Sequence, residues 1–300
     1  MGVKEITVRV PASTSNLGPG FDCLGVGLRL YNEVTIVRGA LGRQPYPPIV
    51  AEAANLFFKR ARRQRFSFSC SGVDKIPRSR GLGGSATIRL GVLFGLNELC
   101  RLPLDRLSIF RLCAQLEGHP DNAAPSSFGG FTVARGENVQ RFEVSPRLYF
   151  VLLVPEFEIE TSAARKILPS RIPRSAAVET CGNACAITAA FASRNYEALR
   201  GAFVDQLHQP FREKLIPFLP RVIAAAEKAG AFGAFLSGSG STICAVTLQD
   251  RHKVAAAMLR AASSRFARTI ITTADNQGIQ IIPFRNPQSA IRNSSRGSSS

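Results

Sequence analysis

Apolar and polar residues alternate along several short stretches of the chain, as they do in strands with one buried face. This alternation predicts a first strand that begins at Ile6 and ends at Pro11, a second around 34–36 and a third at 66–71. Two further apolar stretches, 131–134 and 148–154, also predict strands, and we expect the latter to be buried on both faces. The chain therefore contains several strands spread over its whole length.

Helical periodicity separates these strands. The segments with this pattern are 51–66, 88–99, 103–118, 175–203, 217–229 and 251–262. Asp105 is the expected N-cap of the third helix, which should end near Gly118. A last strand is expected at 269–282, and the serine-rich tail at 284–300 is expected to be disordered.

One glycine-rich stretch, Lys75–Thr87, lies between a predicted strand and a predicted helix, and we call it the anion cradle. The first N–H groups of a helix have no partner within it, so a phosphate can accept their hydrogen bonds. Gly81, Gly83 and Gly84 permit close approach of the backbone, while Arg78 and Arg80 add positive charge. Its spacing matches neither a Walker loop nor a dinucleotide fingerprint. The alternative is a glycine-rich turn that merely opens a buried helix.

Two more loops are rich in small residues. In 12–25, Asn16 and Asp22 are suited to a ligand that carries hydroxyl or ammonium groups, or they serve only as Asx-turn residues. In 233–246, Gly238 and Gly240 indicate either backbone that faces a ligand or a tight hairpin between strands.

Polar side chains are concentrated at 115–125, in the break between two helices. Glu117, His119, Asp121 and Asn122 lie within six positions, where a carboxylate could bind Mg²⁺ and the amide and imidazole could orient a hydroxyl nucleophile. The alternative is that Asp121 or Asn122 caps the next helix.

Arginine and hydroxyl side chains beyond residue 150 provide further candidates. Thr161 and Arg165 are spaced i, i+4, so both can face one site from a helix. Arg212 is expected at the start of another helix.

Composition limits the function classes. The 300 residues are 45% hydrophobic, contain no apolar run of about 20 residues and begin without a hydrophobic signal core, so we expect a soluble cytoplasmic protein without a membrane partner. The formal charge of +17 fits either nucleic acid or small anionic ligands. The basic run 59–65 has no interleaved aromatic residue, which favours a solvated helix face over an RNA-binding patch. The seven cysteines, including Cys181 and Cys185, are expected to be reduced and buried.

Taken together, the three glycine-rich stretches and the 115–125 segment resemble the GHMP superfamily of small-molecule kinases. The segments that carry the resemblance are 11–25, 77–87, 116–125, 236–243 and 273–278. Within the superfamily the likeness is closest to the homoserine kinases, and it covers residues 6 to 283.

This resemblance implies an α+β fold with two domains. Residues 1–148 would form the nucleotide-binding domain, with a left-handed βαβ unit, and 149–283 a ferredoxin-like domain. The implied reaction is ATP-dependent phosphorylation of the side-chain hydroxyl of L-homoserine, a step toward threonine, with Mg²⁺ required. A GHMP kinase for another small alcohol and a catalytically inactive, basic RNA-binding module are the alternatives. The expected partner is a small molecule rather than nucleic acid, and a homodimer is compatible with the resemblance.

The resemblance also implies a role for each candidate residue. Ser85 and Glu117 would bind Mg²⁺, and Asn122, Glu117, Thr161 and Arg165 would be catalytic. L-homoserine would be surrounded by Asn16, Asp22, His119, Asp121, Arg165 and Arg212. The triphosphate would be bound by Pro77, Arg78, Ser79, Arg80, Gly81, Leu82, Gly83, Gly84, Ser85, Ala86 and Thr87.

Three positions bear on catalysis. Asn122 stands where some relatives have an aspartate base, and an amide can orient a hydroxyl but cannot accept its proton. Gly84 replaces a serine that is usual in this family, from which we expect weaker nucleotide binding at most. Gln115 stands where some relatives have a carboxylate.

Overall fold

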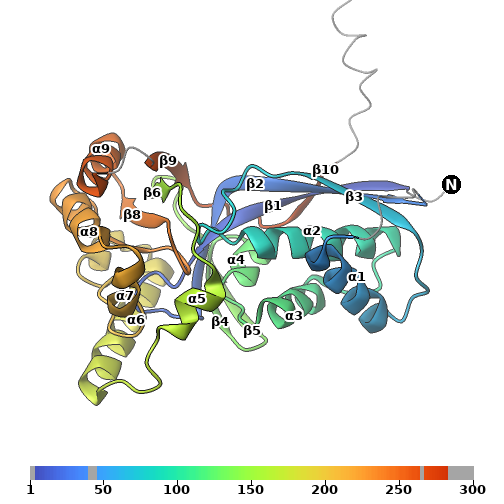
Figure 1. Cartoon of the computed structure of the whole chain (residues 1–300), viewed down its shortest axis with the longest axis horizontal. Helices are drawn as coiled ribbons and strands as arrows, with labels where there is room; N and C mark the ends of the chain where they lie inside the picture. The colour runs from blue at the N-terminus through green and yellow to red at the C-terminus, as the bar shows by residue number, and fades with distance from the viewer. Residues whose placement is uncertain (1–3, 40–45, 264–266, 283–300) are drawn as a thin grey trace, which may run out of the picture.

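Two antiparallel sheets, each covered by helices, organise the computed structural model, which describes residues 4–39, 46–263 and 267–282 (Figure 1). The tail expected to be disordered, 284–300, lies outside these residues. The first sheet has the order β10-β1-β2-β4-β5, with β3 also paired to β2. Its strands are β1 (Glu5–Ser15), β2 (Leu24–Arg38), β3 (Phe68–Val73), β4 (Phe131–Arg135), β5 (Asn138–Phe142) and β10 (Gln280–Ile282).

Helices cover the lower face of this sheet in Figure 1. They are α1 (Pro48–Ala61), α2 (Gly84–Leu99), α3 (Arg106–Glu117) and α4 (Ala123–Phe128). Two glycines bring α2 close to the sheet, because a Cβ on Gly91 would lie 2.4 Å from Val34 and one on Gly95 would lie 2.7 Å from Ile36. The close packing fixes the position of the first turn of α2, where the anion cradle ends.

The second sheet has the order β7-β8-β6-β9. Its elements follow one another as strand, helices, two strands, helix and strand, which is the ferredoxin-like topology that the resemblance implied. The strands are β6 (Tyr149–Pro155), β7 (Gly233–Leu236), β8 (Ile243–Thr247) and β9 (Ala267–Thr273). The helices are α5 (Thr161–Lys166), α6 (Arg174–Ser193), α7 (Gln209–Arg212), α8 (Leu219–Lys228) and α9 (Arg251–Ala262), with 3₁₀ turns at Tyr196–Leu199 and Glu213–Leu215.

Apolar side chains from both sheets share one core. Phe131 of β4 stacks on Phe191 of α6 with ring centroids 4.3 Å apart, and both rings are fully buried. The same cluster contains Val26 of β2 and Phe150 of β6. The two sheets are therefore joined by a continuous apolar contact.

Several predicted elements have different limits in the structure. β1 continues through Pro11 to Ser15, because a register shift between Pro11 and Ala12 accommodates the missing N–H. The strand expected at 269–282 is two strands in different sheets, since the chain crosses from β9 to β10. The helix expected at 175–203 ends at Ser193, and Arg212 ends α7 rather than beginning a helix.

In the described sheet, the two strands of the expected βαβ unit each pair with β2 and not with each other. β3 and β4 are both antiparallel to β2 and therefore run parallel to one another, with α2, α3 and α4 between them in the chain. The left hand of this connection stays a prediction.

Surface positions correct one further expectation. Cys181 and Cys185 are exposed on α6, because they lie on its outer face, so the prediction that they are buried is wrong. The basic run at the end of α1 is exposed, as expected of a solvated face. Across the described ranges, no helix combines the length and the apolar character that spanning a bilayer requires.

Candidate active site

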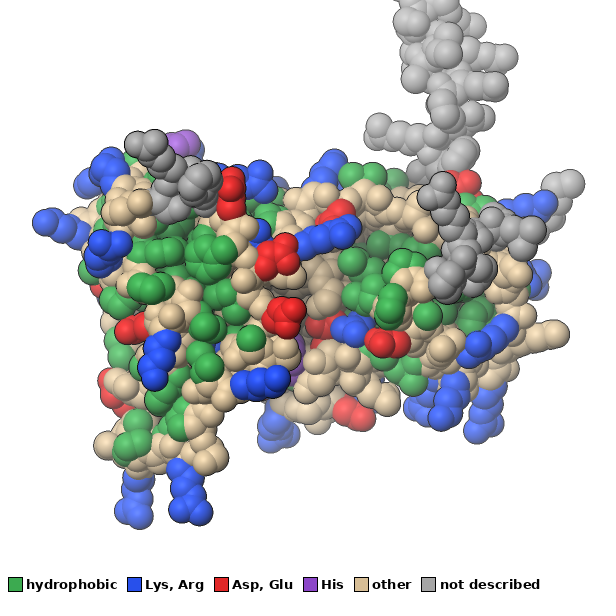
Figure 2. Space-filling model, viewed as in Figure 1, with side chains coloured by type: hydrophobic (Ala, Val, Ile, Leu, Met, Phe, Trp, Pro, Cys, Tyr) green, Lys and Arg blue, Asp and Glu red, His purple; other side chains and the backbone are tan. Residues whose placement is uncertain are grey.

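Loops from both sheets surround a cavity of about 300 Å³. On the face shown in Figure 2, acidic side chains gather in the middle of the molecule, between the parts formed by the two sheets. The lining includes Ser15, Asn16, Phe21, Asp22, residues 78–85, Glu117, His119, Asp121, Asn122, residues 159–161, Arg165, Arg212, Gly238 and Ser239. Most of the residues singled out in the sequence therefore meet at one place.

The anion cradle lines one wall of this cavity. Gly83 is the N-cap of α2 in the left-handed conformation (φ 69°), and no side chain caps the helix, so its first N–H groups are left for a ligand. Residues Arg78 to Ser85 line the wall. Pro77, Ala86 and Thr87 do not: Ala86 belongs to the core, and the Thr87 hydroxyl donates to the carbonyl of Gly84.

Hydrogen bonds join the three glycine-rich loops. The backbone N–H of Ser13 donates to the carbonyl of Leu82, and that of Gly238 donates to the carbonyl of Ser15. The Ser237 hydroxyl donates to the carbonyl of Gly81 over 2.7 Å. A Cβ on Gly81 would lie 2.0 Å from the Ser237 carbonyl oxygen, so only glycine permits this contact.

The two arginines of the cradle are engaged within the protein. Arg78 pairs with Asp74. Arg80 donates from Nε to the carbonyl of Pro155 over 2.8 Å and lies 3.2 Å from the Glu158 carboxylate. Arg80 therefore ties the cradle to the loop that follows β6, and less of its charge is available to a ligand than the sequence suggested.

Glu117 lies beside the first turn of α2. Its Oε2 accepts a 2.7 Å hydrogen bond from the Ser85 hydroxyl, and its Oε1 is paired with the Arg89 guanidinium. Arg89 also contacts Glu52 over 3.2 Å. A hydroxyl and a carboxylate oxygen at the edge of a phosphate-sized loop suit Mg²⁺, which prefers oxygen ligands.

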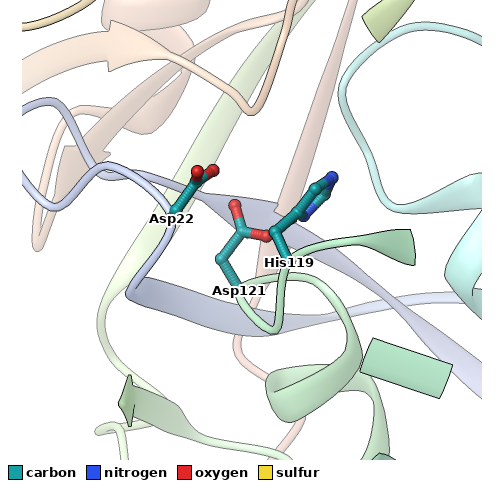
Figure 3. Close-up of side chains that lie close together, drawn as sticks. All are labelled: Asp22, His119 and Asp121. Atoms are coloured by element: carbon teal, nitrogen blue, oxygen red, sulfur yellow. The ribbon is translucent and has the colours of Figure 1, made fainter. Parts of the chain in front are cut away.

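Asp22, His119 and Asp121 form an acidic group at the other end of the cavity (Figure 3). His119 Nδ1 and Asp121 Oδ1 are 2.5 Å apart. Burial alone would lower the pKa of His119, but the hydrogen bond and charge of Asp121 outweigh it and raise that pKa. Burial likewise opposes ionisation of Asp121, yet His119 holds the pKa of this carboxyl below its usual value.

Arg165 balances the negative charge of Asp22. Its Nη2 and Nη1 donate to the two carboxylate oxygens of Asp22 over 2.6 and 3.0 Å. One atom from each of Asp22, His119 and Asp121 could reach a common metal ion, since these atoms lie within 4.8 Å of one another. Because Arg165 already occupies both oxygens of Asp22, the group fits an ammonium ion shared with a guanidinium better than a divalent metal.

Arg212 is 2% exposed, yet it lines the cavity. Its Nε donates to the carbonyl of Ala164, and its Nη1 donates to the carbonyl of Gly238 over 2.9 Å. Within the described ranges no carboxylate pairs with it. Burial, with repulsion from Arg165, lowers its pKa to about 10. A buried guanidinium without a carboxylate partner is costly, and an anionic ligand would relieve that cost.

The remaining predicted residues also face the cavity. Neither Asp121 nor Asn122 caps α4 through its side chain; Asn122 Oδ1 instead accepts a 2.8 Å hydrogen bond from the Ser13 hydroxyl. Asn16 braces its own loop, because its Oδ1 accepts the N–H of Asp22 and its Nδ2 donates to the carbonyl of Gly238. The Thr161 hydroxyl lies 3.3 Å from that of Ser239.

Sequence reasoning missed three groups that position this site. Arg89 neutralises Glu117, Ser237 fixes the cradle, and His208 contacts Arg212. His208 and Arg212 are spaced i, i+4, the same signal that linked Thr161 to Arg165. Ser237 and Arg89 gave no such signal, because their partners are distant in sequence.

Comparison with known proteins identifies the class. Residues 48–130 match the GHMP kinases N terminal domain, and residues 187–267 match the GHMP kinases C terminal domain. This is a two-domain kinase fold of the GHMP type.

Curated relatives narrow the class further. A homoserine kinase from Caldicellulosiruptor bescii is 39% identical over 80% of this chain and 84% of its own length. One from Caldicellulosiruptor saccharolyticus is 34% identical over 96% of this chain and 100% of its own. The crystal structure of homoserine kinase from Cytophaga hutchinsonii superposes with a TM-score of 0.84 at 26% identity, covering 93% of this chain and 98% of that one. The chain belongs to the homoserine kinase family of the GHMP kinases.

Proposed function

We propose that the protein transfers the γ-phosphoryl group of ATP to the side-chain hydroxyl of L-homoserine and releases O-phospho-L-homoserine and ADP. The observation that carries this proposal is the division of charge in one cavity. Arg212 offers a buried cation without a carboxylate partner, Asp22 and Asp121 offer carboxylates, and the cradle offers free helix N–H groups. These three features match the carboxylate and the ammonium of an amino acid and the phosphates of a nucleotide.

Each end of the cavity has a distinct task in this proposal. The cradle residues 78–85 bind the phosphates through backbone N–H groups. Asp22 and Asp121 receive the ammonium of L-homoserine, with His119 fixing the Asp121 carboxylate. Arg212 and Arg165 bind its carboxylate. The hydroxyl to be phosphorylated then lies toward Asn122 and Thr161, between the two ends.

Ser85 and Glu117 are the residues that would hold Mg²⁺ beside the cradle. When bound, the ion neutralises charge on the phosphate oxygens. Asn122 can orient the hydroxyl but cannot remove its proton, and Asp121 is already paired with His119. Catalysis by these residues is therefore positioning rather than strong base catalysis, which suits a loose phosphoryl-transfer transition state.

The decisive experiment is an ADP-release assay on the purified protein with ATP and Mg²⁺. We expect ADP formation that depends on L-homoserine. A panel containing mevalonate, galactose and threonine tests the alternative of another small alcohol, which would show a higher kcat/KM. If no alcohol stimulates ADP release and the protein instead binds RNA in a salt-sensitive manner, the inactive binding module is correct.

Three expectations accompany this proposal. We infer a domain division near residue 148, where the chain passes from β5 of the first sheet to β6 of the second. Limited proteolysis tests the division. A homodimer and a cytoplasmic location stay predictions, which sedimentation and cell fractionation can check.

A further inference from the structure

His208 is fully buried next to the proposed substrate site, and the mechanism above does not use it. Its two ring nitrogens have different partners. Nε2 donates to the carbonyl of Gly18 over 2.8 Å, so Nδ1 is the acceptor for Arg212 Nη1 at 3.2 Å. Burial lowers the pKa of His208 to about 4, which keeps the ring neutral and in this one tautomer at neutral pH.

Asp205 restricts the position of the His208 ring through the backbone that carries it. Its carboxylate accepts the backbone N–H groups of Leu207, His208 and Gln209 over 2.7 to 3.0 Å and lies 3.4 Å from Nε2. These bonds hold the turn that begins α7. The imidazole therefore has little freedom to rotate away from Arg212.

In the described part of the chain, the guanidinium of Arg212 donates hydrogen bonds to neutral acceptors alone. These are the carbonyls of Ala164 and Gly238 and the imidazole of His208. They engage Nε and Nη1 and leave Nη2 without a partner among the described residues. Because a guanidinium is planar, fixing Nε and Nη1 also fixes the direction of Nη2.

We propose that His208 is a positioning residue, which holds Arg212 so that its Nη2 meets the carboxylate of the amino-acid substrate. The proposal rests on the proposed function, since it assumes a substrate carboxylate at Arg212. His208 also contacts Gly18, in the loop that carries Asp22. One neutral ring thus sets the distance between the cation and the acidic group that receive the two ends of one substrate.

The competing explanation is a core histidine that contributes only to stability. Two substitutions separate the explanations, because each keeps one of the two contacts. In His208→Asn the amide oxygen can replace Nδ1 as the acceptor for Arg212, but the side chain is too short to reach Gly18. In His208→Gln the amide nitrogen can replace Nε2 as the donor to Gly18, but the acceptor that Nδ1 provides for Arg212 is lost.

Steady-state kinetics of both variants test the proposal. We expect His208→Gln to raise the KM for L-homoserine roughly tenfold, the cost of one hydrogen bond to a charged group, with kcat and the KM for ATP nearly unchanged. His208→Asn should stay close to the unmodified protein. Equal KM values in the two variants, or KM values that follow their melting temperatures, would overturn the proposal.

A substrate without a carboxylate provides the matched control. 3-Aminopropan-1-ol has the ammonium and hydroxyl groups of L-homoserine but no carboxylate, so its kcat/KM should be low and equal in the unmodified protein and in His208→Gln. An equal fractional loss for both substrates would refute a role through Arg212. Absence of any homoserine-dependent turnover in the unmodified protein would refute the proposed function instead. In that case crystal structures of both proteins still test whether the Arg212 guanidinium turns when His208 is replaced.

Discussion

Side chains in the cavity differ in how much of their charge is balanced inside the protein. Asp22 is paired with Arg165 and Asp121 with His119, so binding an ammonium there requires these partners to share their carboxylates. Among the residues that the structure describes, Arg212 donates only to neutral acceptors. At the scale of residues, the carboxylate of a substrate therefore gains more from binding than the ammonium does.

The pair of His119 and Asp121 predicts a pH dependence of stability. Because the folded protein raises the pKa of His119 above its ordinary 6.5, the stabilisation is fully present below that pH and is lost as the pH rises through the raised pKa. At the acid end it is lost as the pH falls below about 3.8, the ordinary pKa of Asp121, toward its lowered folded value. We expect His119→Gln to cost on the order of 1 kcal/mol at pH 6 and less at pH 9.

Urea unfolding of the unmodified protein and of His119→Gln at pH 6 and pH 9 measures how the cost of the substitution changes with pH. Arg9→Gln, which removes a half-buried ion pair with Glu33, serves as the control, and its cost should not change between these pH values. A loss of stability in His119→Gln that grows with pH would contradict a stabilising ion pair between His119 and Asp121.

Arg89 predicts an effect on metal binding. Its guanidinium neutralises Glu117 before any ion arrives, so removing it should free one carboxylate oxygen. We expect Arg89→Leu to tighten Mg²⁺ binding several-fold, which is about 1 kcal/mol. Titration calorimetry of the protein with its nucleotide detects the change without relying on turnover.

Glu52→Gln is the matched variant, since it removes the other partner of Arg89 and leaves Glu117 untouched. This variant should bind Mg²⁺ like the unmodified protein or slightly more weakly. Unchanged affinity in Arg89→Leu would show that Glu117 is not a metal ligand.

At the scale of elements, the anion cradle contains two glycines that differ in their tolerance of a side chain, Gly84 and Gly81. A Cβ on Gly84 would meet nothing within 4 Å, and Gly84 does not have a positive φ. We expect Gly84→Ser to increase stability by about 0.5 kcal/mol through helix propensity and to leave the KM for ATP equal or lower. Thermal denaturation and ATP kinetics check both expectations.

Gly81→Ala is the contrasting change in the same loop. Its Cβ would lie 2.0 Å from a backbone oxygen at φ 71°, so the loop and Ser237 must separate. A loss of about 2 kcal/mol or more is expected, together with a raised KM for ATP. Equal tolerance of the two changes would disprove the packing of the loops.

Elements that depend on local pattern could be predicted from sequence, and those that depend on distant contacts could not. The helix at 251–262 and the Asp105 cap of α3 agree with the structure because periodicity and capping act within a few residues. The split of 269–282 into β9 and β10 depends on which sheet each half joins. Likewise, Glu117 could be predicted as a site residue from the spacing of its motif. Its partner Arg89 could not, because the two residues meet only when α2 and α3 pack together.

At the scale of the whole molecule, the shared core predicts that both sheets unfold together. Phe191 projects from α6 against Phe131 of β4, so its loss weakens both halves. We expect a single calorimetric transition and a loss of about 3–5 kcal/mol for Phe191→Ala, with the transition still single. The comparison variant is Phe57→Ala, because Phe57 of α1 is buried in the core of the first sheet alone. Two separated transitions in either protein would contradict a common core.

The return of β10 to the first sheet has a consequence for synthesis on the ribosome. β1 is synthesised long before β10, the strand that pairs with its outer edge at residues 280–282. Until then the growing chain carries an open strand edge, which is a template for association between nascent chains. Chaperones that shield such edges should therefore bind this protein during translation and leave it only after β10 has emerged and paired with β1.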